Sequence, residues 1–358
     1  MTCPHEITIG VLADPDLPTR LAHTLGEDLP GRLPGGAGEQ VEWRVLINND
    51  PFEAMYPDSH QLIDKARDYV RETTWDLALC LTDLPMRDGA AVLVAEVDPD
   101  HQVALISLPA LGGSRLRHRL RELAVRIVAL LRSRRPGSTA SPPAPLRGLR
   151  MVEREHEIWL IRSGRFGSLL LLAGMVRANR PWQLVVGLSS ALAGAMAGTA
   201  FGVLYSTIWL LATALGPWRL AGITVSALAA LSTWIVAGHG LWERRTRARA
   251  DRYVVLRNAG TVSTVVVGTI VFFLALYAIT LAAVALVIPP DYLSSTLGRP
   301  CGMPDYLTIA LMATVLGTVA GAVGSGLEDD VTVRKATYGY REEERQRVVD
   351  AQRRARDD

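Results

Sequence analysis

Lysine is nearly missing from this sequence. Of its 38 lysines and arginines, only Lys65 and Lys335 are lysines. Electrostatics does not demand that skew, because either cation serves on a protein surface, and we attribute it to codon bias in a GC-rich bacterial genome. The net charge is also small, +2 at pH 7. That balance argues against any global electrostatic role for the chain.

Cysteine is also scarce, and the pattern of a secretory signal peptide is missing. The three cysteines, Cys3, Cys80 and Cys301, are widely separated and form no CxxC or CxxH spacing. This argues against a disulfide framework and a zinc knuckle. The first thirty residues lack the basic segment and apolar run of a signal peptide. We therefore expect the N-terminal part to stay in the cytosol, with Cys3 and Cys80 as reduced thiols.

The first 132 residues predict a cytosolic α/β domain. Short apolar or alternating runs predict strands, and longer stretches with helical spacing of Leu, Ile and Val predict helices. Their order, β-α-β-α-β-β-β-α, indicates a mixed sheet with helices packed on it. The strands are expected at 6–14, 41–47, 75–81, 90–97 and 101–108, and the helices at 17–29, 60–72 and 115–131.

Two connecting segments follow. Residues 133–149 are rich in Pro, Ser and Gly without an apolar period, which is typical of a linker. Residues 150–181 are amphipathic and basic, and we expect a juxtamembrane helix there. The uncharged core of that helix, 166–176, is shorter than the roughly 20 residues that a membrane span needs. The helix should therefore lie at the membrane interface or pack on the following helices.

Charge is missing from long stretches of the second half. The windows 181–218, 220–242, 258–290 and 306–327 contain no Asp, Glu, Lys or Arg, and His239 is their one histidine. Each window exceeds the roughly 18-residue threshold for a transmembrane helix. Residues 182–327 thus predict an all-α bundle of four transmembrane helices. Their expected bounds are 184–215, 219–241, 261–288 and 306–326.

The segment WERRTRARADRYVVLR, residues 242–257, is unusually rich in arginine. A nucleic-acid interface would need interleaved aromatic residues, and Tyr253 alone is thin support, so we expect no nucleic-acid partner. Short cytosolic loops of membrane proteins collect arginine, whereas the other two loops carry only Arg219 and Arg299. The asymmetry predicts a multi-pass protein of the bacterial inner membrane. Both termini, including a charged tail at 328–358, should lie in the cytoplasm.

Glycines recur at helical spacing in two of the predicted spans. Such stripes let helix backbones approach closely, which promotes association in lipid. The stripe can pack helices within one chain or form a contact between subunits, and we favour the former slightly. The residues concerned are Gly187, Gly194, Gly198, Gly202, Gly317 and Gly321.

Neutral polar residues such as Thr199, Thr224, Ser232, Thr264 and Thr269 also lie in the spans. They could line a passive pore, but such residues more often bond to their own helix or to a neighbouring one. The lack of buried acids and bases argues against an ion-coupled carrier.

Acidic residues follow three predicted strands of the α/β domain. Asp14, Asp50 and Asp83 stand where the carboxyl ends of strands hold ligands in open α/β sheets. Together they are candidates for a Mg²⁺ or small-ligand site. The alternative is that they are ordinary turn residues. No glycine-rich phosphate-binding motif accompanies them, so a nucleotide has no support.

Two stretches resemble known families. The strand, hairpin and helix from Trp75 to Leu131 resemble archaemetzincin-type zinc proteases, whose helix carries HExxH. Glu122 matches the general base, but Arg121 and Val125 replace the two histidines, so the resemblance implies a catalytically dead domain. The tail LEDDVTVRKATYGYREEERQRVVDAQRRARDD, with the preceding VGSG, is similar to uncharacterised actinobacterial membrane proteins. That family implies no activity.

We therefore expect an integral inner-membrane protein that is not an enzyme and needs no cofactor. The bundle would anchor and assemble, with a homo-oligomer as one outcome, while the α/β domain and tail bind a cytosolic protein. The alternative is a homo-oligomeric channel or passive transporter gated by that domain. An enzyme using the acidic strand ends is a third hypothesis, weakened because no nucleophile–base pair is visible.

Overall fold

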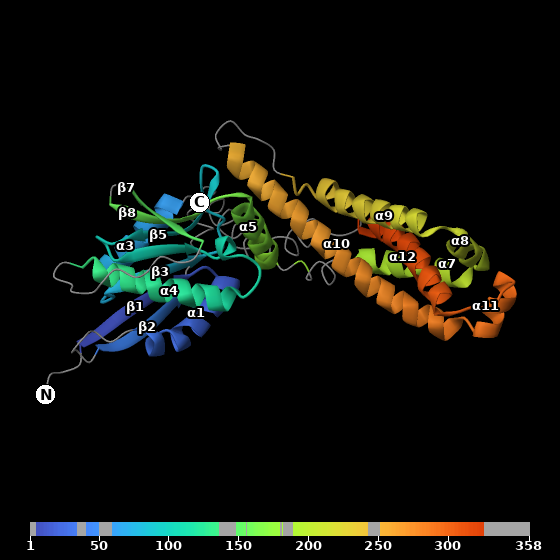
Figure 1. Cartoon of the computed structure of the whole chain (residues 1–358), viewed down its shortest axis with the longest axis horizontal. Helices are drawn as coiled ribbons and strands as arrows, with labels where there is room; N and C mark the ends of the chain where they lie inside the picture. Colours follow the sequence, from blue (N-terminus) through green and yellow to red (C-terminus); the bar gives the residue numbers. More distant parts are fainter. Residues whose placement is uncertain are drawn as a thin grey trace, which may run out of the picture. The chain divides into compact units, whose positions relative to one another are not determined.

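The computed structural model describes residues 5–33, 41–49, 59–135, 148–154, 156–179, 181, 189–242 and 251–325. The chain divides into two compact units, and the boundary falls between Ala178 and Asn179. We call the described residues up to Ala178 the α/β unit and those from Asn179 the helical unit (Figure 1). Most of the predicted linker, 136–147, and the predicted tail, 328–358, lie outside the described residues.

One mixed sheet forms the centre of the α/β unit, with strand order β2-β1-β3-β6-β5-β8-β7. The first four strands in that order run parallel, and the last three are antiparallel to their neighbours. The short β4 (Arg87–Asp88) pairs with β5. The other bounds are β1 (His5–Ala13), β2 (Val41–Asn49), β3 (Leu77–Thr82), β5 (Ala91–Asp98), β6 (Val103–Ser107), β7 (Arg150–Arg154) and β8 (Glu157–Arg162).

Helices cover both faces of this sheet. α3 (Ser59–Glu72) packs Ile63 and Ala66 on the face that carries Leu12, Ala78 and Cys80. On the opposite face, α1 (Leu17–Asp28) places Gly26 against Val45 and Ile47 of β2. α4 (Leu116–Ser133) lies beside α1. Because both faces are covered, β3 is buried at every residue. The predicted mixed α/β sheet domain is confirmed.

The prediction of one helix over 150–181 is wrong. Residues 150–162 instead form the β7–β8 hairpin, and the helix that follows, α5 (Arg165–Ala178), is shorter. The physical reason is the alternation in EIWLIR, which buries Ile158 and Leu160. β8 thereby pairs with β5, which would otherwise be an open edge of the sheet. The α/β unit thus extends well beyond the expected end at residue 132.

The helical unit contains three helices long and apolar enough to cross a membrane, or four if a bent pair counts as one span. The three are α9 (Pro217–Gly238), α10 (Asp251–Val287) and α12 (Met303–Ser325). The bent pair is α7 (Ser189–Leu204) and α8 (Ser206–Ala214), which meet at 84°. The short α11 (Pro290–Leu297) lies between α10 and α12.

The expected continuous helix over 184–215 is therefore broken within the described residues. Tyr205 adopts an extended conformation, with φ −98° and ψ 110°, which ends the α7 hydrogen-bond ladder. A helix end leaves carbonyl groups without helical partners. The Trp209 indole nitrogen donates to the carbonyl of Gly202 at 3.2 Å and satisfies one of them. The bend is thus stabilised by a side chain of the following helix.

Candidate functional site

The structure describes two of the three acids predicted at strand ends. Asp14 follows β1 and is buried, and Asp83 follows the neighbouring strand β3. The Asp14 amide donates to the carbonyl of Leu81 at 3.1 Å, which holds the two strand ends together. Asp50 lies outside the described residues. Among the described residues, no group of three or more His, Cys, Asp or Glu side chains could hold a metal ion.

A different charged cluster lies at the other end of the sheet, on the side covered by α3. Its centre is Arg67 of α3, whose guanidinium contacts three carboxylates. It donates to Asp98 of β5 at 2.7 Å, to Glu157 of β8 at 3.0 Å and to Asp64 at 2.6 Å. Arg67 therefore ties the helix to both strands. Charge-assisted bonds of this kind are the stronger hydrogen bonds of proteins.

Glu96 is the most deeply buried acid of this cluster, with no exposed surface. In the sheet it lies between Leu105 of β6 and Trp159 of β8. Burial, with the nearby Glu157 carboxylate second, raises the pKa of Glu96 to about 8. Glu96 consequently keeps its proton at neutral pH, when an exposed glutamate would have lost it.

Asp98 behaves in the opposite way. Burial by itself would raise the pKa of Asp98, but hydrogen bonds from His101 and Arg67 outweigh burial and lower it. The His101 ring nitrogen Nδ1 lies 2.8 Å from Asp98, and its Nε2 lies 3.1 Å from Arg71. The cluster thus separates two buried carboxyl groups into one neutral and one ionised group, a pattern that occurs at functional sites and in structural ion-pair networks.

The chemistry of this cluster favours a structural clamp. The guanidinium of Arg67 is engaged by three acids, and its side chain is only 20% exposed. Trp159 also donates its indole N–H to Glu157 at 3.1 Å. These contacts join α3, β5 and β8, and so attach the β7–β8 hairpin to the sheet. Sequence reasoning missed the cluster, although an acid inside the apolar run AVLVAEV was a usable signal.

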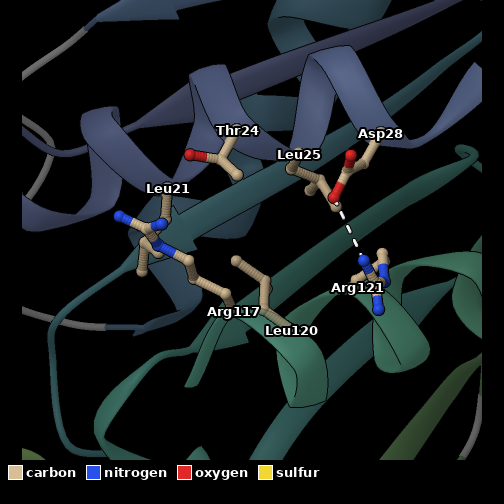
Figure 2. A pocket seen from close by; sticks show the side chains of 7 residues that line it. All are labelled: Leu21, Thr24, Leu25, Asp28, Arg117, Leu120 and Arg121. Carbon is tan, nitrogen blue, oxygen red and sulfur yellow. Dashed lines mark hydrogen bonds and ion pairs between the residues drawn. The ribbon is translucent and has the colours of Figure 1, made fainter. Parts of the chain in front are cut away.

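A shallow hollow lies between α1 and α4 (Figure 2). Its empty volume is about 200 Å³ and includes open solvent, which is below the usual range for a ligand pocket. Arg121 points across it toward Asp28, and the two side chains pair at 3.2 Å. The neighbouring Glu122 is about half exposed and lies 3.4 Å from His118. The helix that resembles the protease helix therefore directs Arg121 into a surface ion pair with Asp28 and Glu122 toward His118.

The predicted glycine stripes lie at the contact between α7 and α12 within one chain. A Cβ added to Gly198 would lie 2.9 Å from the Cα of Gly317 and 2.7 Å from the Ala320 Cβ. Gly194 and Gly321 likewise face backbone carbonyls of the partner helix, those of Ala320 and Ala191. Gly202 abuts Ala313 of α12. Gly187 lies outside the described residues.

The neutral polar residues of the helical unit bond mainly within or between helices. Thr199, Thr224, Thr280, Thr314 and Thr318 each donate to a carbonyl three or four residues earlier. Two further pairs link separate segments. Ser232 of α9 donates to Thr269 of α10 at 3.2 Å, and Asn179 donates to Thr264 at 3.0 Å. Such hydroxyl groups are satisfied without water.

No family model, curated protein or solved structure matches this chain. The likenesses to archaemetzincin-type proteases and to actinobacterial membrane proteins therefore stay interpretations of the sequence.

Proposed function

We propose that the protein is a multi-pass component of the bacterial inner membrane and not an enzyme. Its helical unit anchors the chain and supports assembly, and its α/β unit binds a protein partner in the cytosol. The proposal places both termini in the cytoplasm, following the arginine distribution. It treats the bilayer as the first partner and needs neither a cofactor nor a nucleic acid.

The outward surface of the long helices carries this proposal. Trp218 in α9 is 88% exposed, Leu286 in α10 is 86% exposed and Val323 in α12 is 73% exposed. Large apolar side chains at such exposure are unfavourable in water but suit hydrocarbon. The helices also satisfy their backbone groups internally, as a bilayer requires.

We also propose that four helices cross the membrane as one bundle. α7 alone has 16 residues and rises about 24 Å, most of the hydrocarbon thickness. α8 would then lie along the outer interface, since it leaves α7 at 84°. Its Trp209 packs edge-on against Tyr292 of α11 with ring centres 5.9 Å apart. Tryptophan and tyrosine are the residues that favour the headgroup layer.

The interior of the helical unit favours an assembly role over conduction. The α7–α12 contact is close enough for glycine alone, and Thr280, Thr314 and Thr318 bond to their own helices. The α/β unit adds a covered sheet whose charged cluster acts as a clamp. A rigid domain of this kind on a membrane anchor suits partner binding.

The second candidate is a homo-oligomeric channel or passive transporter gated by the α/β unit. The 84° bend between α7 and α8 favours it, because broken helices recur where membrane proteins bind or conduct solutes. In that case several copies would have to surround the pore.

Three experiments on the full-length protein separate these proposals. Alkaline carbonate should leave the chain in the membrane fraction, and a C-terminal tag should resist protease added to intact spheroplasts. Reconstituted protein should release no ions or small solutes from liposomes above the rate of empty vesicles. Extraction by carbonate would overturn the membrane proposal, and protein-dependent flux would favour the channel.

A further inference from the structure

The outward side of α5 carries large apolar residues at the surface of the α/β unit. Phe166 is 72% exposed and Leu169 is 63% exposed. The other side of the helix is packed: Leu171 and Met175 are buried, and Gly174 abuts Pro109 of the short helix η2 (Pro109–Leu111). Because the helix is anchored by this packing, the exposed side chains of Phe166 and Leu169 belong to an ordered surface of the α/β unit. We call Phe166 and Leu169 the apolar face of α5.

The residue that follows α5 connects it directly to the helical unit. Asn179 is buried there and donates to Thr264 of α10 at 3.0 Å. Thr264 lies near the beginning of the uncharged stretch that starts after Arg257. A bilayer that surrounds α10 must have one edge near the start of this stretch, because charged side chains avoid hydrocarbon. The end of α5 is thus covalently held close to that edge.

The charge of α5 fits the same surface. Arg165 and Arg177 stand at its two ends and are exposed. The helix RFGSLLLLAGMVRA contains no Asp or Glu. Arginines beside an exposed apolar face are the usual composition of helices that lie on anionic membranes. A surface that faced water would not explain the exposed apolar side chains. An acidic groove of a partner protein would explain the arginines but not the apolar face.

We infer that the apolar face of α5 inserts into the headgroup layer of the cytosolic leaflet, with Arg165 and Arg177 on anionic phospholipid headgroups. This contact fixes the α/β unit to the membrane surface. The occupant is lipid, and not a second copy of the chain or a cytosolic protein. The inference rests on the proposed membrane location of the helical unit.

Depth-dependent quenching tests it on the full chain. Cys3 and Cys301 are replaced by serine, and the buried Cys80 stays. An environment-sensitive fluorophore is then attached at Leu169→Cys, and the protein is placed in nanodiscs with anionic lipid and lipid spin-labelled near the headgroup. A helix at the interface sits ~5–10 Å deep, so about a twofold loss of fluorescence is expected.

Two matched labels make the result decisive. Leu274→Cys marks an exposed position of α10 and should be quenched by spin labels deeper in the acyl chain. His118→Cys marks an exposed position of α4 and should not be quenched. If the label at 274 stays bright, the membrane proposal itself fails. If it is quenched and the label at 169 stays bright, only the α5 inference fails.

The lipid composition tests the arginines separately. Replacing the anionic lipid with a zwitterionic one, or introducing Arg165→Gln with Arg177→Gln, should weaken quenching at position 169. The label at 274 reports whether each variant is still folded and inserted. Unchanged quenching at 169 under both changes would overturn the role of the headgroups. Quenching that depends on protein density in the membrane would show a second copy as the occupant instead.

Discussion

At the scale of single residues, a buried acid carries the clearest consequence. Glu96 has no exposed surface and lies among Leu105, Trp159 and the carboxylate of Glu157. Ionising this carboxyl group would place a negative charge in the protein interior, where the lost hydration is not fully replaced by other interactions. The fold tolerates a buried Glu96 because this carboxyl group is protonated at neutral pH. The stability of the α/β unit should therefore depend on pH.

The sign follows from proton binding. The pKa of Glu96 rises from its ordinary value of 4.5 to about 8. Between these values the folded state holds a proton that the unfolded state has lost, so this group makes the free energy of unfolding fall as pH rises. Glu96→Gln should leave stability near wild type at pH 5. At pH 9 the free energy of unfolding of Glu96→Gln should exceed that of wild type by roughly 1–3 kcal/mol.

Cys80 provides the measurement. It is 2% exposed in the core of the α/β unit, and burial raises the pKa of its thiol, with the charge of Asp14 adding to the effect. A thiol-reactive dye should label it only on unfolding. Melting curves are recorded with Cys3 and Cys301 replaced by serine. Glu122→Gln, an exposed glutamate, is the control, and equal Tm values for wild type and Glu96→Gln at pH 9 would contradict the prediction.

At the scale of elements, the contact between α7 and α12 depends on missing side chains. A Cβ on Gly198 would meet the Ala320 Cβ at 2.7 Å and the Gly317 Cα at 2.9 Å, and both of these neighbours are fixed to the backbone. Close approach of helices replaces the hydrophobic driving force that lipid lacks. Loss of this approach should loosen the helical unit.

Gly198→Ala should therefore destabilise the helical unit by about 1–3 kcal/mol, the usual cost of overpacking. Gly222→Ala in α9 is the matched control, because nothing lies within 4 Å of the added carbon. Thermal aggregation of the detergent-solubilised protein, followed by size-exclusion chromatography, gives both values. A Gly198→Ala protein as stable as Gly222→Ala would mean that α7 and α12 do not pack as closely as described.

The elements also show where sequence patterns fail. The alternation in EIWLIR was present, but the surrounding basic and apolar residues suggested one long helix. The strand forms instead of the helix because the edge of β5 is available, and β8 pairs with it in antiparallel register. Similarly, the uncharged segment VLYSTIWL (203–210) carries no sequence signal for the bend at Tyr205, which is stabilised by the Trp209 indole at the Gly202 carbonyl.

At the scale of the whole molecule, Cys301 is a natural reporter of topology. It is partly exposed in the segment between α11 and α12. Asp305 accepts from the Gly302 amide at 2.9 Å and so caps the start of α12 just beside it. The proposed topology, which follows the arginine distribution, would put this segment on the outer side of the membrane.

A membrane-impermeant maleimide should therefore label intact cells at Cys301. Cys301→Ser should abolish labelling, because Cys80 is buried and Cys3 is expected in the cytosol. Permeabilised cells carrying Cys301→Ser give the background from Cys3. Labelling that appears only after permeabilisation would reverse the proposed orientation.

The sequence by itself determined the broad division of the chain. Uncharged windows longer than a membrane span and alternating or helical apolar periods are local properties, so they predicted the long apolar helices and the mixed sheet. The candidate site was a different matter. Asp14, Asp50 and Asp83 were candidates for a Mg²⁺ or small-ligand site, with ordinary turn residues as the alternative, and Asp50 lies outside the described residues.

Only the tertiary structure decided which side chains meet. The cluster of Arg67, Glu96, Asp98 and Glu157 comes from three separate parts of the sequence, α3, β5 and β8, and the Arg67 side chain bonds to both strands. The same holds for Gly198 and Gly317, whose facing positions required α7 to pack on α12. Periodicity specifies the face of each element, but the partner of that face depends on packing and burial across the whole chain.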